Sequence, residues 1–78
     1  MSDETSKPGS SEPIRVFAEM RVVQPKTIGI WVGKYKPDGE EEWVWLPRSQ
    51  VHWHYLNRRI RRRCAITMPE WLADDRGL

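Results

Sequence analysis

The sequence of 78 residues predicts a mainly β protein. We expect a small, strongly bent antiparallel sheet or open barrel of about five strands, with a short C-terminal helix. Several segments alternate apolar and polar residues, which is typical of strands that bury one face. Clusters of Pro, Gly, Asp and Asn stand between those segments and predict turns. Only the last segment, after Pro69, has the start and stop signals of a helix.

The folded domain is predicted to span residues 14–78, after a disordered tail of residues 1–13. The tail consists of Ser, Pro, Gly and charged residues, and Met1 is its only large apolar residue. Such a segment buries too little apolar surface to offset the entropy that ordering costs. From residue 14 to residue 22 every even position is apolar and most odd positions are charged, so a first strand is predicted there.

A second strand is predicted over residues 27–35, where Ile and Val occupy positions 28, 30 and 32. Gly29 and Gly33 flank Trp31 on the other face of this strand. Glycine inside a strand often marks a bulge or the close approach of another backbone. We therefore expect the second strand to coil sharply, as a small barrel requires.

Turn signals divide the rest of the β region. Pro37, Asp38 and Gly39 predict a hairpin turn, followed by a third strand over residues 41–46. Residues 47–50 then interrupt the pattern and predict a turn or a single 3₁₀ turn.

The fourth and fifth strands are predicted over residues 51–56 and 60–67. In the fourth strand, apolar and aromatic residues alternate with two histidines. Residues 57–58 are expected to turn the chain into the fifth strand. A helix over residues 55–63 is the alternative.

The C-terminal helix is predicted because residues 67–70 resemble a capping box, with Pro69 in the first turn. Trp71 and Leu72 are expected to anchor this helix on the sheet. Gly77 suits the position just past the end of the helix.

The tryptophans are the largest apolar side chains of this short chain. We expect Trp71, together with Trp43 or Trp45, to lie in the core. The spacing leaves open whether Trp31 or Trp53 is exposed.

Composition restricts the class of protein. A chain of this length holds one small domain, and its 13 Lys and Arg against 11 Asp and Glu give a net charge of +2. Cys64 is the only cysteine, which excludes an intramolecular disulfide. No apolar run approaches the roughly 18 residues of a membrane span, and the N-terminus lacks the apolar core of a signal peptide. We therefore expect a cytoplasmic protein.

Catalytic and metal chemistry have little support in the sequence. His52 and His54 have the spacing of a metal pair, but no further ligands stand at zinc-like spacing, so exposed strand histidines are favoured. Ser49 has no evident base, and Gly29 and Gly33 fit no phosphate-binding or dinucleotide-binding loop. We expect a non-enzymatic protein without cofactor or metal.

A basic and aromatic segment is the strongest functional signal. No Asp or Glu occurs between Trp43 and Glu70, whereas residues 58–63 are all Arg except Ile60. Guanidinium groups bind phosphates and carboxylates, and aromatic faces stack on bases. The candidate partner-binding residues are Arg48, Trp53, Arg58, Arg59, Arg61, Arg62 and Arg63.

The predicted fifth strand gives this segment a specific geometry. Arg59, Arg61 and Arg63 would share one face at intervals of about 7 Å, which matches the spacing of nucleic-acid phosphates. The same row suits an acidic protein surface. The alternative without a partner is an edge strand whose charges prevent aggregation.

Two motifs resemble those of a group of small uncharacterised proteins from bacteria, phages and other mobile elements. The motifs are Trp-Leu-Pro-Arg-Ser-Gln at residues 45–50 and Pro-Glu-Trp-Leu-Ala at residues 69–73. The resemblance covers roughly the last two thirds of the chain and implies a compact β-rich fold and a mobile-element origin. It implies no catalytic residue. The arginine run at residues 58–63 departs from the short turn of that group.

The function predicted from these observations is a non-enzymatic binding module, encoded by a phage or mobile element. It would hold nucleic acid or a nucleoprotein through the Arg and aromatic surface in a bacterial cytoplasm. The alternative is a protein-directed inhibitor of a host defence complex, of the anti-CRISPR type. A structural or assembly role without nucleic-acid contact is the third hypothesis.

Overall fold

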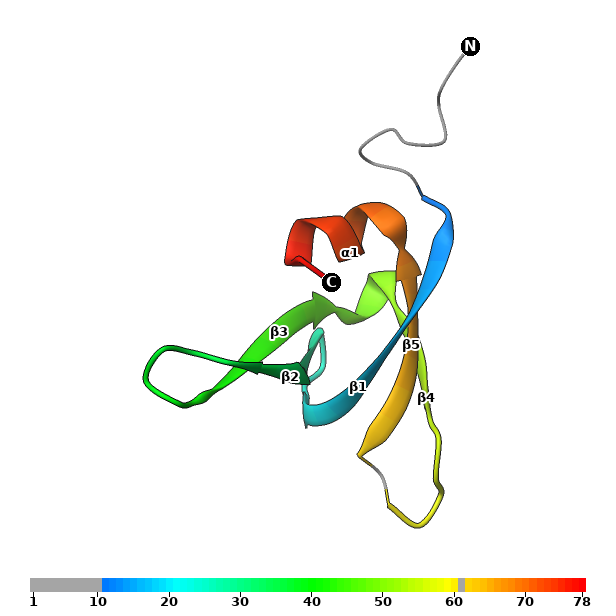
Figure 1. The fold of residues 1–78 in the computed structure, drawn as a ribbon. Helices are drawn as coiled ribbons and strands as arrows, with labels where there is room; N and C mark the ends of the chain where they lie inside the picture. The colour runs from blue at the N-terminus through cyan, green and yellow to red at the C-terminus, as the bar shows by residue number, and fades with distance from the viewer. Residues whose placement is uncertain (1–10, 61) are drawn as a thin grey trace.

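The computed structural model describes residues 11–60 and 62–78, which form five antiparallel strands in one open sheet and a short α-helix. The elements are β1 (Pro13–Val23), β2 (Thr27–Tyr35), β3 (Glu41–Pro47), the 3₁₀ turn η2 (Arg48–Gln50), β4 (His52–Tyr55), β5 (Arg63–Pro69) and α1 (Glu70–Arg76). Their order across the sheet is β3-β2-β1-β5-β4, so η2 carries the chain from one edge strand to the other (Figure 1). The predicted fold class is confirmed.

β1 joins two hairpins because each hairpin pairs with a different part of it. Residues 13–19 of β1 pair with β5, and residues 19–23 pair with β2. Glu19 is the position where both pairings meet, opposite Trp31 of β2 and Arg63 of β5. The β2–β3 and β4–β5 hairpins therefore leave the centre of the sheet in different directions (Figure 1).

The hydrophobic core lies between α1 and one face of the sheet, here called the inner face. Its buried residues are Ala18, Met20, Ile28, Ile30, Leu46, Val51, Cys64, Ile66, Met68, Leu72 and Ala73. Full burial of an aliphatic side chain stabilises the fold by about 1.5–3 kcal/mol. The even positions of β1 and β2 contribute to this face, which confirms the alternation predicted for the first two strands.

The C-terminal end of α1 is tied to the β2–β3 hairpin by two long side chains. Arg76 Nε donates to the carbonyl of Trp45 at 2.8 Å, and Lys34 Nζ donates to the carbonyl of Gly77 at 3.3 Å. Gly77 has a φ of 74° and ends the helix in the left-handed region, as predicted. Leu72 is fully buried beneath the helix.

Both glycines of β2 have the roles that glycine takes in strands. The pairing with β3 shifts register between Trp31 and Tyr35, and Gly33 within this interval has a φ of 90°. A Cβ on Gly29 would lie 3.1 Å from the indole ring of Trp45. The predicted bulge is confirmed at Gly33. At Gly29 the group that approaches closely is the Trp45 indole and not another backbone, so the backbone approach is not found there.

The first hairpin turn and the 3₁₀ turn also agree with the sequence. Gly39 has a φ of 93°, and the Asp38 carboxylate accepts a hydrogen bond from the backbone N–H of Glu40 at 3.0 Å. η2 interrupts the chain within the predicted residues 47–50.

The fifth strand differs from the prediction. β5 begins at Arg63 and not at residue 60, and it ends at Pro69. Cross-strand pairing sets this start, because Arg63 pairs with Glu19 of β1 and its carbonyl accepts from the N–H of Leu56. Residues 56–60 are bends and irregular backbone, so the alternative helix is wrong as well.

The helix start also differs. Thr67 lies within β5, opposite Arg15 and His52, and is therefore not available as a cap. Pro69 is the N-cap in extended conformation, without a side-chain cap. The backbone N–H of Glu70 instead donates to a backbone carbonyl, that of Glu12, at 2.8 Å.

The expected burial of Trp43 or Trp45 is wrong. Their exposed fractions are 37% and 44%, because Val44 and Leu46 take the inward positions of β3 and the indoles lie on the opposite, outer face. Trp71 is half-buried and packs against the core, so Leu72 is the more deeply buried anchor of α1.

Candidate functional site

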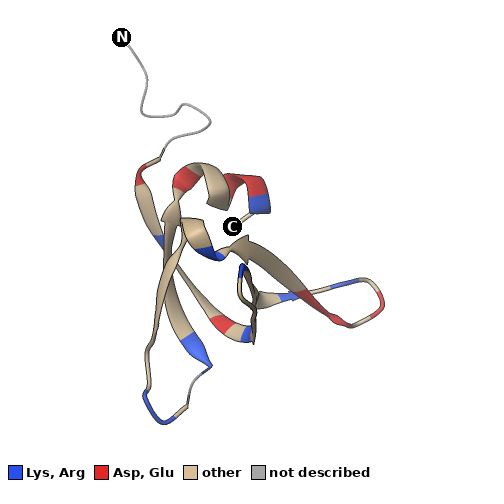
Figure 2. Cartoon of the chain, turned by 180° about the vertical axis from the view of Figure 1, so that it is seen from behind, with Lys and Arg blue, Asp and Glu red and all other residues tan. Residues whose placement is uncertain are grey.

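The end of the β4–β5 hairpin is strongly basic. We call residues 56–60, 62 and 63 the basic tip; Arg61, which the prediction included, lies outside the described residues. Its four described arginines are exposed, and none forms an ion pair with a described residue. These arginines are Arg58, Arg59, Arg62 and Arg63. Basic residues gather at this end of the hairpin in Figure 2.

Backbone hydrogen bonds hold the base of the basic tip. The N–H of Leu56 donates to the carbonyl of Arg63 at 2.9 Å, and the N–H of Met20 donates to the carbonyl of Arg62 at 2.7 Å. Asn57 Oδ1 accepts from the N–H of Arg59 at 2.8 Å. The arginines therefore lie in a turn whose base is held by backbone hydrogen bonds. Within the turn, the Asn57 side chain accepts a hydrogen bond from a backbone N–H that is no longer part of a strand.

The sequence predicted three arginines on one strand face, and the structure does not have this alignment. Arg59 lies in a bend and only Arg63 lies on β5, while Arg61 falls outside the described residues. The basic tip is thus mostly an irregular turn with exposed arginines and not a row of arginines along one strand.

Two other predicted site residues lie away from the basic tip. The Arg48 guanidinium lies 5.3 Å from the ring centroid of Trp53, and Arg48 Nη1 donates to the carbonyl of Gln24 at 2.8 Å. Arg48 precedes β4, at the end of the strand opposite the tip. Its contacts tie η2 to β4 and to the β1–β2 turn, which is a structural role.

The odd positions of the strands form an outer aromatic face that the sequence reasoning missed. Trp31 pairs with Trp43, and the ring centroids of Trp43 and Trp45 are 6.1 Å apart. Phe17 and Tyr35 are exposed as well. The alternation of β3 contained this signal, since the two aliphatic residues at its even positions already fill the inner face.

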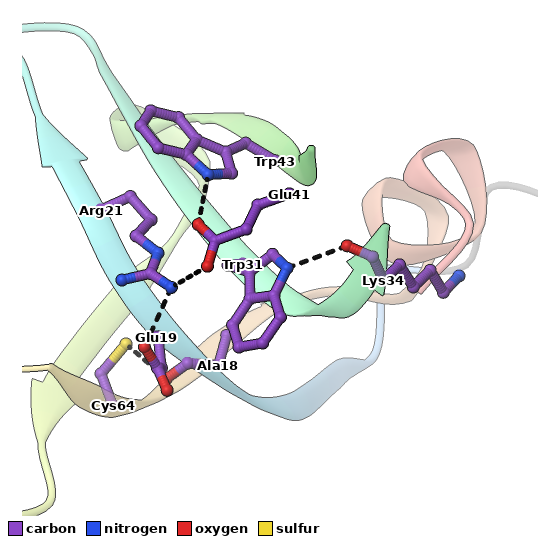
Figure 3. Close-up of polar contacts among 8 residues, drawn as sticks. All are labelled: Ala18, Glu19, Arg21, Trp31, Lys34, Glu41, Trp43 and Cys64. Carbon is purple, nitrogen blue, oxygen red and sulfur yellow. Dashed lines mark hydrogen bonds and ion pairs between the residues drawn. The ribbon is translucent and has the colours of Figure 1, made fainter. Parts of the chain in front are cut away.

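A charged network holds two rings of this face in place (Figure 3). Arg21 Nη2 lies 2.7 Å from a carboxylate oxygen of Glu41 and 3.3 Å from one of Glu19, and the guanidinium carbon lies 5.2 Å from the Trp31 ring centroid. The Glu41 carboxylate also accepts from Trp43 Nε1 at 3.2 Å. Two carboxylates share one guanidinium, so the network has one negative charge in excess.

A shallow pocket connects the basic tip with the outer face. It opens where β2 diverges from β1, and Phe17, Glu19, Trp31, Gly33 and Arg63 are among its lining residues. Arg63 thus belongs both to the basic tip and to the surface beside the aromatic rings.

The thiol and the two histidines of the chain lie in different surroundings. Burial raises the pKa of the Cys64 thiol, against the smaller opposing effect of the Arg63 charge. Its Sγ donates to the carbonyl of Ala18 at 3.5 Å. His52 and His54 are exposed, and no cluster of three or more His, Cys, Asp or Glu side chains within residues 11–60 and 62–78 could hold a metal ion.

Comparisons of the chain with protein-family models, with characterised proteins and with solved structures find no match. Among the residues that the structure describes, no helix is long and apolar enough to cross a membrane. The resemblance to small phage and mobile-element proteins stays a prediction.

Proposed function

We propose that this protein is a non-enzymatic module that binds nucleic acid, free or within a nucleoprotein, through its basic tip. The observation that carries the proposal is the group of four exposed arginines without an ion pair among the described residues. An unpaired guanidinium keeps all five of its N–H donors for a phosphate.

The crowding of like charges supports the same conclusion. Adjacent cations repel one another, and an exposed hairpin gains solubility equally well from charges of both signs. A polyanion that binds at the tip relieves this repulsion and releases counterions. Phage or mobile-element origin and action in a bacterial cytoplasm are part of the proposal.

The test is a titration of labelled single-stranded and double-stranded DNA and RNA at several salt concentrations. R58Q/R59Q/R62Q should weaken binding, and the slope of log K against log salt should fall by about one unit per lost phosphate contact. The matched control is R15Q/K26Q/K36Q, which removes three exposed charges elsewhere. Absence of binding by the wild type at low salt would contradict the proposal, as would equal losses in both variants.

A protein partner is the second candidate, because the basic tip also exposes apolar side chains. Leu56 is 50% exposed and Ile60 is 56% exposed. Such residues among arginines suit an acidic protein surface with apolar patches, as in an inhibitor of a host defence complex. L56S/I60S would then abolish stoichiometric binding to a purified defence complex, and the wild type would have little affinity for free DNA or RNA.

A further inference from the structure

We propose that the pocket beside the basic tip is a base-stacking subsite for single-stranded nucleic acid, with Phe17 as its main platform. The inference rests on the proposed function and specifies the form of nucleic acid. Its basis is the juxtaposition of the Arg63 guanidinium, which has no ion pair with a described residue, with two aromatic side chains, Phe17 and Trp31, around one pocket.

Phe17 has an unusual amount of free ring surface for a residue in a central strand. It is 54% exposed on the outer face. Its partner in β5 is Ala65, whose small side chain does not cover the ring, and β2 has already diverged from β1 at this level. Gly33, which also lines the pocket, adds no side chain. The ring therefore lies beside an open space on the flank where β2 has left β1.

Trp31 is held in a fixed orientation beside this space. Its Nε1 donates to the carbonyl of Lys34 at 2.9 Å, the Arg21 guanidinium lies over the ring, and the Tyr35 ring meets it edge-on at 5.5 Å between centroids. A ring that is already fixed loses little conformational entropy when a base packs against it.

The charges on the two sides of the pocket give the ligand a direction. Arg63 and the rest of the basic tip lie on the β5 side, and Glu41 lies on the β3 side. Glu19, which shares Arg21 with Glu41 and leaves that network with one negative charge in excess, lines the pocket itself, opposite Arg63 in the β1–β5 pairing. A phosphate backbone is attracted to the first side and repelled from the second. A strand bound with its phosphates along the basic tip directs its bases toward Phe17.

This arrangement favours a single strand over a duplex. Base–aromatic stacking needs an exposed base face, and a base inside a duplex is stacked on its neighbours. A duplex therefore reaches the arginines through its phosphates alone, while a single strand gains the stacking contact as well. The stacking is independent of sequence because every base has a π face.

The test compares labelled oligo-dT and oligo-rU with a duplex of equal length at low salt, by fluorescence anisotropy. Phe17→Leu removes the ring but keeps an apolar side chain, and it should lower single-strand affinity about five- to 150-fold with little effect on the duplex. Phe17→Tyr keeps the ring and should bind like the wild type. Trp43→Leu, on the far side of the negative network, is the control for loss of an outer-face ring.

A second measurement uses the wild-type protein alone, so it stands even if a variant fails to fold. An abasic oligonucleotide of the same length keeps the phosphates, and it should bind more weakly than oligo-dT by a factor similar to the effect of Phe17→Leu. Equal affinities for the abasic strand and oligo-dT would overturn the inference and leave the proposed function standing. If the wild type binds none of these probes, the proposed function fails too.

Discussion

The β2–β3 and β4–β5 hairpins lie on opposite sides of β1 in the sheet and have different charge patterns. The β2–β3 hairpin carries Lys34, Lys36, Asp38 and residues 40–42, all glutamates, around its turn. The β4–β5 hairpin has arginines and apolar residues at its turn and no Asp or Glu (Figure 2). The turn of the first hairpin carries charges of both signs, whereas the turn of the second carries positive charges alone.

Under the proposed function, this difference marks the β4–β5 hairpin as the one that binds an external anion. In the β2–β3 hairpin, Glu41 meets Arg21 and Asp38 accepts a backbone hydrogen bond, so two of its carboxylates have partners within the fold. The arginines of the basic tip have no such partner among the described residues. Solubility explains a mixed-charge turn, but a turn of one sign is better explained by binding.

The largest expected effect concerns the hydrophobic core between α1 and the sheet, to which both hairpins contribute side chains. Leu72→Ala should destabilise the protein by about 2–5 kcal/mol, because Leu72 is fully buried between α1 and the sheet. In so small a domain this loss is a large fraction of the total stability. Leu72→Met conserves volume and is the control, with an expected cost under about 1.5 kcal/mol.

Amide hydrogen exchange would show whether the hairpins form one cooperative unit. In Leu72→Ala, the amides of both hairpins should lose protection together. Persistent protection of one hairpin would mean that the two are separate folding units. A cooperative variant with a melting temperature within a few degrees of the wild type would show that α1 is peripheral.

The second prediction tests whether nucleic-acid affinity depends on the charges of the basic tip or on the net charge of the whole protein. E40Q/E42Q raises the net charge by as much as R58Q/R59Q lowers it, since each variant changes two charges. The hairpins point in different directions, and screening limits the reach of exposed charges to about 8 Å at physiological salt. We therefore expect E40Q/E42Q to change nucleic-acid affinity much less than R58Q/R59Q does.

Glu41 is left intact in this variant because it holds Arg21 and Trp43. The measurement is the same salt-dependent titration, with both double variants and the wild type in parallel. Equal and opposite changes in affinity would mean that the overall charge of the protein decides binding, and that the basic tip is not a site.

The sequence predicted most of the sheet because alternation and turn residues are local signals. β1 and β2 follow from period-two patterns, and Gly39 and Gly77 lie where a left-handed backbone is required. The start of β5 cannot be predicted from the neighbouring sequence, because the arginine run contains neither apolar–polar alternation nor a strand-breaking residue. The pairing of Arg63 with Glu19 of β1 decides it.

The candidate site was predictable in composition but not in geometry. The basic tip coincides with the arginine run, yet Arg48 and Trp53 are near that run only in sequence. Arg48 contacts Trp53 and the carbonyl of Gln24. Phe17 is separated from Arg63 by more than forty positions of the sequence. Only the pairing of β1 with β5 brings them to one pocket.

The smallest expected effect tests whether the basic tip is ordered by its own turn. Asn57→Ala removes the acceptor for the N–H groups of Arg59 at 2.8 Å and Ile60 at 3.4 Å, and both groups then turn to water. The cost should be at most about 1 kcal/mol, because the turn is exposed. Amide exchange at Arg59 and Ile60 should accelerate, while the amides of the β2–β3 hairpin stay unchanged. Asn57→Asp keeps the acceptor oxygen and should preserve the turn, but its carboxylate should weaken binding of a polyanion. Unchanged exchange in Asn57→Ala would mean that the anchored ends of the hairpin alone fix the arginines.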